Sequence, residues 1–291
     1  MKNVYLSDSG PKVSEAIYGF WRWKDEGTNT IKRMEQIVNL CISLGINTFD
    51  HADIYGSATA EKYFGEVIKG RSFKREDIVL FSKAGICMSG RGFTYINTSA
   101  EHITKTVNSA LINLRTDYLD VFLLDHVDHL SDMESTAKAL MLLVKQGKIK
   151  SIGVSNFNVF QHQQLASYLS VPIVTNHLEL NLLNISAIED GRVDFIKQRF
   201  SKPLAWAPLA GGKILNGGDA KSELLRARLG EIGIKHDANI EQVAVAWLMQ
   251  LGTLPIIGSL NEERIRNAAT ASEIKLSQED WYELFHIAKL K

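Results

Sequence analysis

The sequence is poor in residues that cross-link a chain, divide it or hold it in a membrane. Its two cysteines, Cys41 and Cys87, have no metal-ligand spacing and are too few for a disulfide scaffold of this size, which favours reduced thiols. The five prolines are scattered, and no segment rich in Pro, Gly or Ser interrupts the chain, so we expect a single domain over residues 1–291. No apolar run approaches the roughly 18 residues of a membrane span, and the residues from Met1 to Val4 lack the apolar segment of a signal peptide. We therefore expect a cytoplasmic protein with no membrane partner.

An excess of charge of either sign is also absent. Lysine and arginine together number 33, as do aspartate and glutamate, and the formal net charge is +0. Without a basic stripe or an acidic tail, the sequence has no electrostatic footprint for nucleic acid. The partner that we expect is a small molecule. We also expect a monomer or a weak oligomer, and no metal site.

What the sequence has is a repeated unit, in which a short apolar run precedes an amphipathic stretch of helical spacing about eight times. The run Leu119–Leu124 is too uniformly apolar for a half-exposed strand and suits a parallel strand covered on both faces. Strands that alternate with helices favour a parallel sheet, and eight units favour its closure into an α/β, eight-stranded parallel (β/α)8 TIM barrel. The expected strands lie near residues 15–20, 46–50, 78–82, 119–124, 150–154, 172–176, 203–206 and 255–257. The expected helices lie near 30–44, 58–69, 99–114, 133–146, 158–168, 186–199, 221–234, 239–251 and 261–270, with an additional C-terminal helix at 277–289.

Polar residues follow the apolar runs directly, where a parallel barrel brings its strand ends together. Asp50 ends the second predicted strand, Tyr55 lies in the loop after it, and Lys83 follows the third strand. A lysine cation stabilises the anion of a nearby phenol, and a carboxylate keeps that lysine charged and oriented. Each residue alone has a plain alternative: a turn cap for Asp50, a surface aromatic for Tyr55 and a solvent-reaching side chain for Lys83. Their occurrence together at neighbouring strand ends favours a catalytic trio.

Two other segments indicate how a pocket is built around these residues. Gly19, near the end of the first strand, permits close approach of a cofactor or substrate, and Trp21 and Trp23 follow it as walls of an apolar pocket or as ordinary packing. The segment from Met88 to Ser99 is long for a connection between a strand and a helix, and loops of this length are often functional. We expect it to lie over the mouth of the barrel.

Several short segments stand in a characteristic order along the chain. They are Phe49–Gly56, Phe81–Lys83, Gly147–Ile149, Gly153–Phe157, Pro255–Ser259 and, after these, Arg264. In these segments the chain resembles the aldo-keto reductase family, from about residue 14 to residue 288, and looks closest to bacterial oxidoreductases that carry the motif DHADIYG. The resemblance implies a barrel that binds NADPH without a Rossmann fold, which agrees with the absence of a G-x-G-x-x-G segment between a strand and a helix.

The resemblance also implies a role for each member of the trio. Tyr55 would be the general acid that protonates a carbonyl oxygen, Lys83 would lower the pKa of Tyr55, and Asp50 would support Lys83. The implied activity is the NADPH-dependent reduction of an aldehyde or a ketone by hydride transfer.

Further residues match the family's contacts with the nicotinamide half of the cofactor and with its pyrophosphate. Ser155 and Asn156 match the residues that hold the nicotinamide carboxamide, and Trp206 matches the aromatic side chain on which the ring stacks. Paired glycines and a lysine in the next loop also suit a phosphate on physical grounds, although a plain flexible turn is the alternative. The residues of that loop that match the pyrophosphate contacts are Leu209, Gly211, Gly212 and Lys213.

The adenosine half has its own matches. Ser259 and Arg264 correspond to the positions that hold the adenosine 2′-phosphate, and a guanidinium near the start of a helix suits a phosphate. A solvated helix residue is the alternative for Arg264. Gly258 stands where many relatives have a lysine.

The sequence departs from the family at two positions in the candidate site. Asp125 falls on the position of the catalytic histidine, with His126 after it, and His177 replaces a glutamine beneath the carboxamide. A histidine can still exchange one hydrogen bond with the cofactor. Three interpretations of Asp125 remain open: a protonated donor whose pKa is raised by burial and by Asp50, a one-residue strand shift that brings in His126, or an impaired site.

These departures leave two alternatives to carbonyl reduction. Family members that reduce activated carbon–carbon double bonds have a glutamate at the position of Asp125, which makes that reaction one alternative. The other is an impaired or non-catalytic barrel that binds a nicotinamide cofactor and acts as a redox sensor or binds a protein partner.

Overall fold

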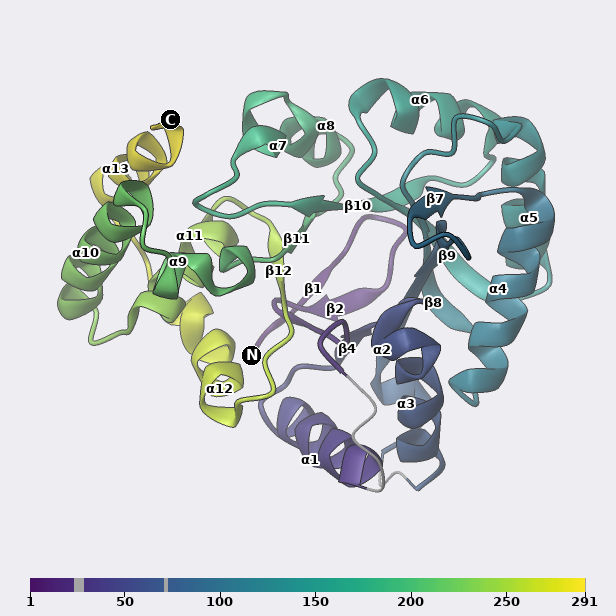
Figure 1. The fold of residues 1–291 in the computed structure, drawn as a ribbon, viewed down its shortest axis with the longest axis horizontal. Coiled ribbons are helices and arrows are strands. Elements are labelled where there is room, and N and C mark those ends of the chain that lie inside the picture. The colour runs from purple at the N-terminus through teal and green to yellow at the C-terminus, as the bar shows by residue number, and fades with distance from the viewer. Residues whose placement is uncertain (24–28, 71–72, 291) are drawn as a thin grey trace.

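A closed barrel of eight parallel strands forms the centre of the computed structural model, which describes residues 1–23, 29–70 and 73–290 (Figure 1). Each strand pairs with the next one along the chain, and the last pairs with the first. In order around the barrel the strands are β3 (Ile17–Gly19), β4 (Thr48–Asp50), β5 (Val79–Ala84), β8 (Leu119–Asp125), β9 (Ile149–Ser155), β10 (Ile173–Glu179), β11 (Leu204–Trp206) and β12 (Leu254–Ile257). The predicted (β/α)8 architecture is therefore confirmed.

Helices surround the barrel, and many begin at a side-chain cap. Asn158 and Asn239 each accept a hydrogen bond from the backbone N–H three residues on, and each donates its own backbone N–H to the side-chain oxygen of the glutamine there. Each pair of bonds satisfies two helix-start N–H groups. The helices are α1 (Asn29–Ser43), α2 (Tyr55–Ala58), α3 (Ala60–Lys69), α4 (Ala100–Asn113), α5 (Met133–Lys145), α6 (Val159–Tyr168), α7 (Ser186–Glu189), α8 (Arg192–Gln198), α9 (Lys213–Asn216), α10 (Ala220–Lys235), α11 (Ile240–Gln250), α12 (Glu262–Thr270) and α13 (Gln278–Lys289). Short 3-10 turns lie at Arg75–Asp77, Ala210–Gly212 and Ala271–Glu273.

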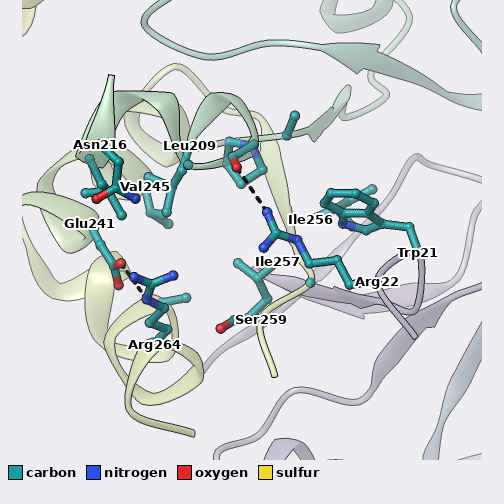
Figure 2. Close-up of a pocket in the computed structure, with 17 residues that line it drawn as sticks. Trp21, Arg22, Leu209, Asn216, Glu241, Val245, Ile256, Ile257, Ser259 and Arg264 are labelled. Atoms are coloured by element: carbon teal, nitrogen blue, oxygen red, sulfur yellow. Dashed lines mark hydrogen bonds and ion pairs between the residues drawn. The ribbon is translucent and has the colours of Figure 1, made fainter. Parts of the chain in front are cut away.

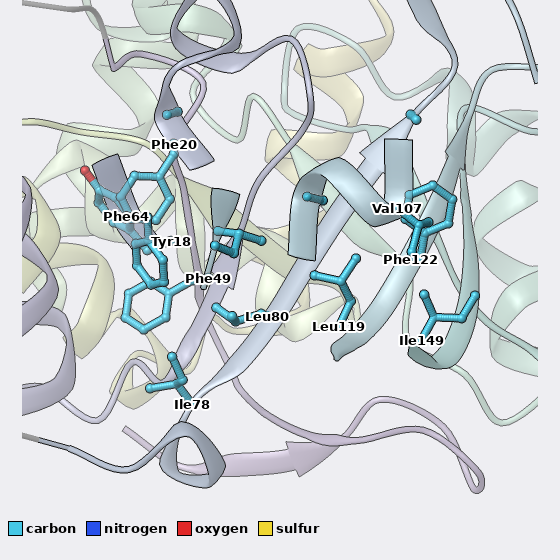
Figure 3. Close-up of a cluster of buried hydrophobic side chains, with 14 of the residues drawn as sticks. Tyr18, Phe20, Phe49, Phe64, Ile78, Leu80, Val107, Leu119, Phe122 and Ile149 are labelled. Carbon is cyan, nitrogen blue, oxygen red and sulfur yellow. The ribbon is translucent and has the colours of Figure 1, made fainter. Parts of the chain in front are cut away.

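Alternation along the strands separates an inner core from an outer one. Phe81 and Val121 point into the barrel, where they pack with apolar residues of the other strands. Their neighbours Leu80 and Phe122 point outward and pack against the helices (Figure 3). Because the side chains of a strand alternate, Asp125 lies on the same inward face as Val121. This register excludes the one-residue shift considered from the sequence.

Two short hairpins were not predicted as strands. β1 (Asn3–Tyr5) pairs with β2 (Lys12–Ser14), and Leu6 and Val13 join the inner core at the amino-terminal end of the barrel. β6 (Ile86–Met88) pairs with β7 (Thr94–Ile96), so the long segment after Lys83 is a hairpin rather than an irregular loop. The first hairpin closes the bottom of the barrel, while the second stands beside its carboxyl-terminal mouth.

The C-terminal helix is tied to the barrel layer by two tryptophans. The rings of Trp247 in α11 and Trp281 in α13 stack with centroids 4.9 Å apart. Each indole N–H donates to the backbone carbonyl of the other residue, at 3.1 Å and 3.0 Å. The additional C-terminal helix is thus confirmed as a packed element. No helix in the described part of the chain is long and apolar enough to cross a membrane.

Candidate active site

The trio expected from the sequence meets at the ends of two neighbouring strands. Lys83 Nζ donates to Asp50 Oδ1 at 2.6 Å and to the backbone carbonyl oxygen of His51 at 2.9 Å. It also lies 4.8 Å from the centre of the Tyr55 ring. The side chains of Lys83 and Asp50 are 3% and 2% exposed, so this ion pair is almost completely removed from water.

Burial and charge act in opposite directions on this trio. Burial alone would lower the pKa of the Lys83 ammonium, but the carboxylates of Asp50 and Asp125 outweigh it and raise that pKa above its usual value. Burial raises the pKa of the Tyr55 phenol by more than Lys83 lowers it. Lys83 is therefore a fixed cation, and Tyr55 stays protonated at neutral pH.

Asp125 reaches the same pocket, but the expectation of a raised pKa was wrong. Burial alone would raise the pKa of its carboxyl, yet His126 and Lys83 outweigh burial, and the pKa lies below its usual value. His126 Nδ1 lies 2.9 Å from Asp125 Oδ1, and this carboxylate raises the pKa of the imidazole. The His126 side chain is 43% exposed, against 11% for Asp125. The pair thus consists of an ionised aspartate and a more exposed histidine that is easily protonated. Both residues line the pocket.

Three neighbouring strand ends place amide, indole and imidazole groups beside the trio. Asn156 Nδ2 donates to Ser155 Oγ at 3.1 Å, and Asn156 Oδ1 accepts from Trp206 Nε1 at 3.1 Å. His177 is buried, and its Nε2 has no partner among the described residues. Burial lowers the pKa of His177 to about 4, so the ring is neutral at neutral pH. All four side chains line the same pocket as Tyr55.

Left-handed backbone recurs where these strands end. His126, Asn156 and Ala207 directly follow β8, β9 and β11, and their φ angles are 68°, 61° and 51°. Residues other than glycine seldom adopt this conformation. Here it turns the chain at the mouth of the barrel, and each of the three residues lines the pocket.

A second pocket continues from the first toward α11 and α12, and Figure 2 shows its lining. Trp21, Ala207 and Ile256 line both pockets. Gly211 and Gly212 have positive φ angles, and a Cβ at Gly211 would meet nothing within 4 Å, so this turn leaves open space. Ser259 and Arg264 line the far end (Figure 2). Lys213 does not line either pocket, whereas the other predicted residues of this loop do.

The sequence of this chain is similar to sequences of known proteins over almost its whole length. The family model described as "Aldo/keto reductase family" matches residues 15–289. The chain belongs to the aldo/keto reductase family. It is 39% identical to the uncharacterized oxidoreductase YcsN of Bacillus subtilis, over 98% of this chain and 97% of that protein. It is 34% identical to a 6-dehydroglucose reductase of Agrobacterium fabrum, over 99% and 98% of the two chains.

A solved structure of an aldo-keto reductase agrees with the fold. The crystal structure of the thermostable aldo-keto reductase Tm1743, in a complex with the inhibitor epalrestat, superimposes with a TM-score of 0.86 and 26% identity. The match covers 99% of this chain and 100% of that chain. The chain is therefore an aldo/keto reductase in sequence and in architecture, which makes it an oxidoreductase.

Protein side chains lie close against two glycines of this aldo/keto reductase. A Cβ at Gly19 would lie 2.8 Å from Ile256 Cγ2, and Gly19 lines neither pocket, although it was expected to approach a cofactor. A Cβ at Gly258 would lie 2.5 Å from Trp21 Nε1. The indole of Trp21 thus occupies the space that a side chain at position 258 would need, which explains why a lysine is not accommodated there.

Arg22 and Glu241 line the second pocket, and sequence reasoning assigned a role to neither. Arg22 Nη2 donates to the carbonyl oxygen of Gly211 at 3.3 Å, across the pocket (Figure 2). Its position directly after Trp21 was a usable signal. Glu241 lies 2.9 Å from Arg264 Nε, but it is one acid among several near a predicted helix start. Only the fold brings it to Arg264.

Proposed function

We propose that this chain is an NADPH-dependent oxidoreductase that reduces the carbonyl group of a small molecule, with Tyr55 as the general acid. The observation that carries the proposal is the buried ion pair beside Tyr55, in which Lys83 Nζ lies 2.6 Å from Asp50 Oδ1. These residues line a pocket that is continuous with a second pocket. A protonated phenol beside a fixed cation suits the donation of one proton to a developing oxyanion.

The residues present fit a nicotinamide dinucleotide. The unpartnered Nε2 of His177 and the side chains of Ser155 and Asn156 supply polar groups for a carboxamide. The open turn at Gly211 leaves room for a pyrophosphate, and Arg264 supplies a cation for a 2′-phosphate. We assign Trp206, Leu209, Gly212, Gly258 and Ser259 to the same cofactor site, and Gly19 and Lys213 to its support.

The chain's own residues would divide the chemistry among them. Hydride donation to a carbonyl carbon is what bound NADPH would supply. Tyr55 gives its hydroxyl proton to the carbonyl oxygen, and Lys83 stabilises the phenolate that remains. We assign the second hydrogen bond to that oxygen to the His126 imidazolium, because an ionised Asp125 has no proton to donate.

The pocket walls suggest the kind of carbonyl compound to test. Trp21, Ile54 and Ile86 are apolar, while Asp125 and His126 are polar and charged. A mixed lining of this kind suits a hydroxylated carbonyl compound, and a relative at 34% identity carries the name 6-dehydroglucose reductase. The substrate panel should therefore hold sugar-derived carbonyls beside simple aldehydes, ketones, quinones and enones.

Substitution of Tyr55 tests the proposal directly. In Tyr55→Phe the proton donor is lost, so the rate of carbonyl reduction should fall by about 10²-fold or more, the scale of general acid catalysis. The affinity for NADPH, measured by quenching of tryptophan fluorescence, should stay within a few-fold. A variant that reduces the substrate at the wild-type rate would show that the proton comes from elsewhere.

A nicotinamide-binding barrel without turnover is the second candidate function. It is favoured by one observation, the lowered pKa of Asp125, because an ionised carboxylate in the pocket opposes a developing oxyanion. This candidate predicts tight NADPH binding without NADPH oxidation by any member of the panel. Oxidation with enones alone would instead indicate reduction of activated double bonds.

A further inference from the structure

The far end of the second pocket contains an ion pair in which Arg264 has a proposed role but its partner, Glu241, has none. Glu241 lies in the first turn of α11, Arg264 lies in the first turn of α12, and both side chains line the pocket. Glu241 Oε1 is 2.9 Å from Arg264 Nε, and the two side chains are 14% and 45% exposed (Figure 2). Glu241 is therefore the more buried partner, while the guanidinium of Arg264 is partly exposed and available to a phosphate.

Within the described part of the chain, no second cation supports Arg264 at this end of the pocket. Gly258 has no side chain, and Arg33 donates its Nη2 to the carbonyl oxygen of Leu260 at 2.7 Å. The first turn of α12 also carries two further acids, Glu262 and Glu263. Among the described residues that line this end of the pocket, a single guanidinium is thus matched by a single carboxylate.

We propose that Glu241 is a specificity-determining residue that weakens the preference of this site for NADPH over NADH. Its carboxylate repels a 2′-phosphate that binds Arg264, and it accepts a hydrogen bond from the 2′-hydroxyl that NADH has instead. An acidic side chain in this role, opposite an arginine in the other, is a general solution for recognising the adenosine ribose. The inference rests on the proposed function, because it requires that the pocket hold a nicotinamide dinucleotide.

The geometry also decides the sign of the effect. Glu241 Oε1 lies 2.9 Å from Nε of Arg264, and no hydrogen bond of Nη1 or Nη2 is found among the described residues. The terminal nitrogens form a fork suited to phosphate, and Glu241 is not needed to hold a proton on them. Removal of the carboxylate therefore removes repulsion and takes no donor away from the phosphate.

The experiment compares dissociation constants for NADPH and NADH in the full chain, by tryptophan-fluorescence titration at about pH 8, on the alkaline side because burial raises the pKa of Glu241. The variants are Glu241→Gln, the matched control Glu262→Gln, Arg264→Leu and the double variant Glu241→Gln/Arg264→Leu. In Glu241→Gln the ratio of the NADH constant to the NADPH constant should rise by about three- to tenfold, the effect expected for one partly buried charge pair. It should change less than twofold in Glu262→Gln, and a gain in NADPH affinity should remain in the Arg264→Leu background, because the carboxylate repels the phosphate itself.

Each result decides the matter. A ratio that is unchanged or falls in Glu241→Gln overturns the inference, because it means that Glu241 only positions Arg264 or does nothing. An equal rise in Glu262→Gln also overturns it, since the effect would then come from net charge. Should the glutamine variant fail to fold, Glu241→Ser, which keeps a residue suited to a helix start, repeats the test. If the wild-type chain binds neither cofactor, the proposed function itself fails, and that outcome is distinct from the others.

Discussion

At the scale of single residues, the charge on Lys83 is balanced inside the barrel chiefly by Asp50. In Lys83→Met the Asp50 carboxylate stays buried without its cation, so we expect the free energy of unfolding to fall by about 3–5 kcal/mol. Urea denaturation measures this loss. The double variant Asp50→Asn/Lys83→Met should recover part of it, and a double variant as unstable as the sum of both changes would contradict the charge argument.

The proposed role of His126 predicts a pH dependence of the reaction with a definite sign. The pKa of His126 is raised by Asp125, so the imidazolium donor is present below that pKa and is lost as the pH rises through it. We expect kcat/KM to fall along this limb at a pH above the ordinary value for histidine, about 6.5. In Asp125→Asn the limb should move to lower pH. Coincident pH–rate profiles would remove His126 from the reaction.

Asp125 also shows which properties of a single residue can be predicted from the sequence. Its place at an inward strand end was predictable, because strand alternation and the inward-facing Val121 define its side of the barrel. Its protonation state was not predictable, since it depends on distances to His126 and Lys83 that only the fold sets. Glu241 was missed for the same reason: its partner, Arg264, lies on another helix.

At the scale of elements, α13 depends on the tryptophan pair that joins it to α11. Trp281→Ala removes the stacked ring and leaves the Trp247 carbonyl without its indole donor. We expect the free energy of unfolding to fall by about 3–5 kcal/mol, as for other large aromatic residues cut to alanine. Trp281→Phe keeps the ring contact and should lose less. Equal losses in the two variants would assign the stability to the hydrogen bond instead.

The β6–β7 hairpin is the element most suited to controlling access to the pocket. Its base residue Ile86 lines the pocket, while Phe93 and Tyr95 are exposed large hydrophobic side chains. Replacement of residues 88–94 by a short turn should raise KM for bulky carbonyl compounds and leave the dissociation constant of NADPH unchanged. Steady-state kinetics with a small and a bulky substrate, beside a fluorescence titration, separate the two effects.

Which elements the sequence predicts depends on their length and pattern. The barrel strands and long helices were found because apolar spacing repeats in them, but the predicted helix 186–199 is in fact two helices. Gly191, with φ of 79°, separates α7 from α8. The β1 and β2 strands are no shorter than the barrel strands β3 and β4, but they form a hairpin outside the repeat of an apolar run followed by a helix, and they were missed.

At the scale of the whole molecule, the two pockets connect the beginning of the barrel to its end. Trp21 follows β3 and Arg264 lies in α12, so a dinucleotide across both pockets would join segments far apart in the chain. At an NADPH concentration about 100 times its dissociation constant, the free energy of unfolding should rise by about 2.7 kcal/mol. Thermal unfolding with and without NADPH measures this. Arg264→Leu should need more NADPH for the same gain, and a wild-type curve indifferent to NADPH would contradict binding to the native state.

The left-handed residues at the barrel mouth should respond differently to selection for heat resistance and to selection for turnover in directed evolution. Each of His126, Asn156 and Ala207 stays in a conformation that glycine adopts at lower cost. A library screened only for heat resistance would therefore gain glycine at these positions, first at Ala207, whose methyl group brings least to the pocket. A library screened for turnover would keep His126 and Asn156 despite their strain. Positions that become glycine in one library but not in the other would be those whose side chains are needed for turnover.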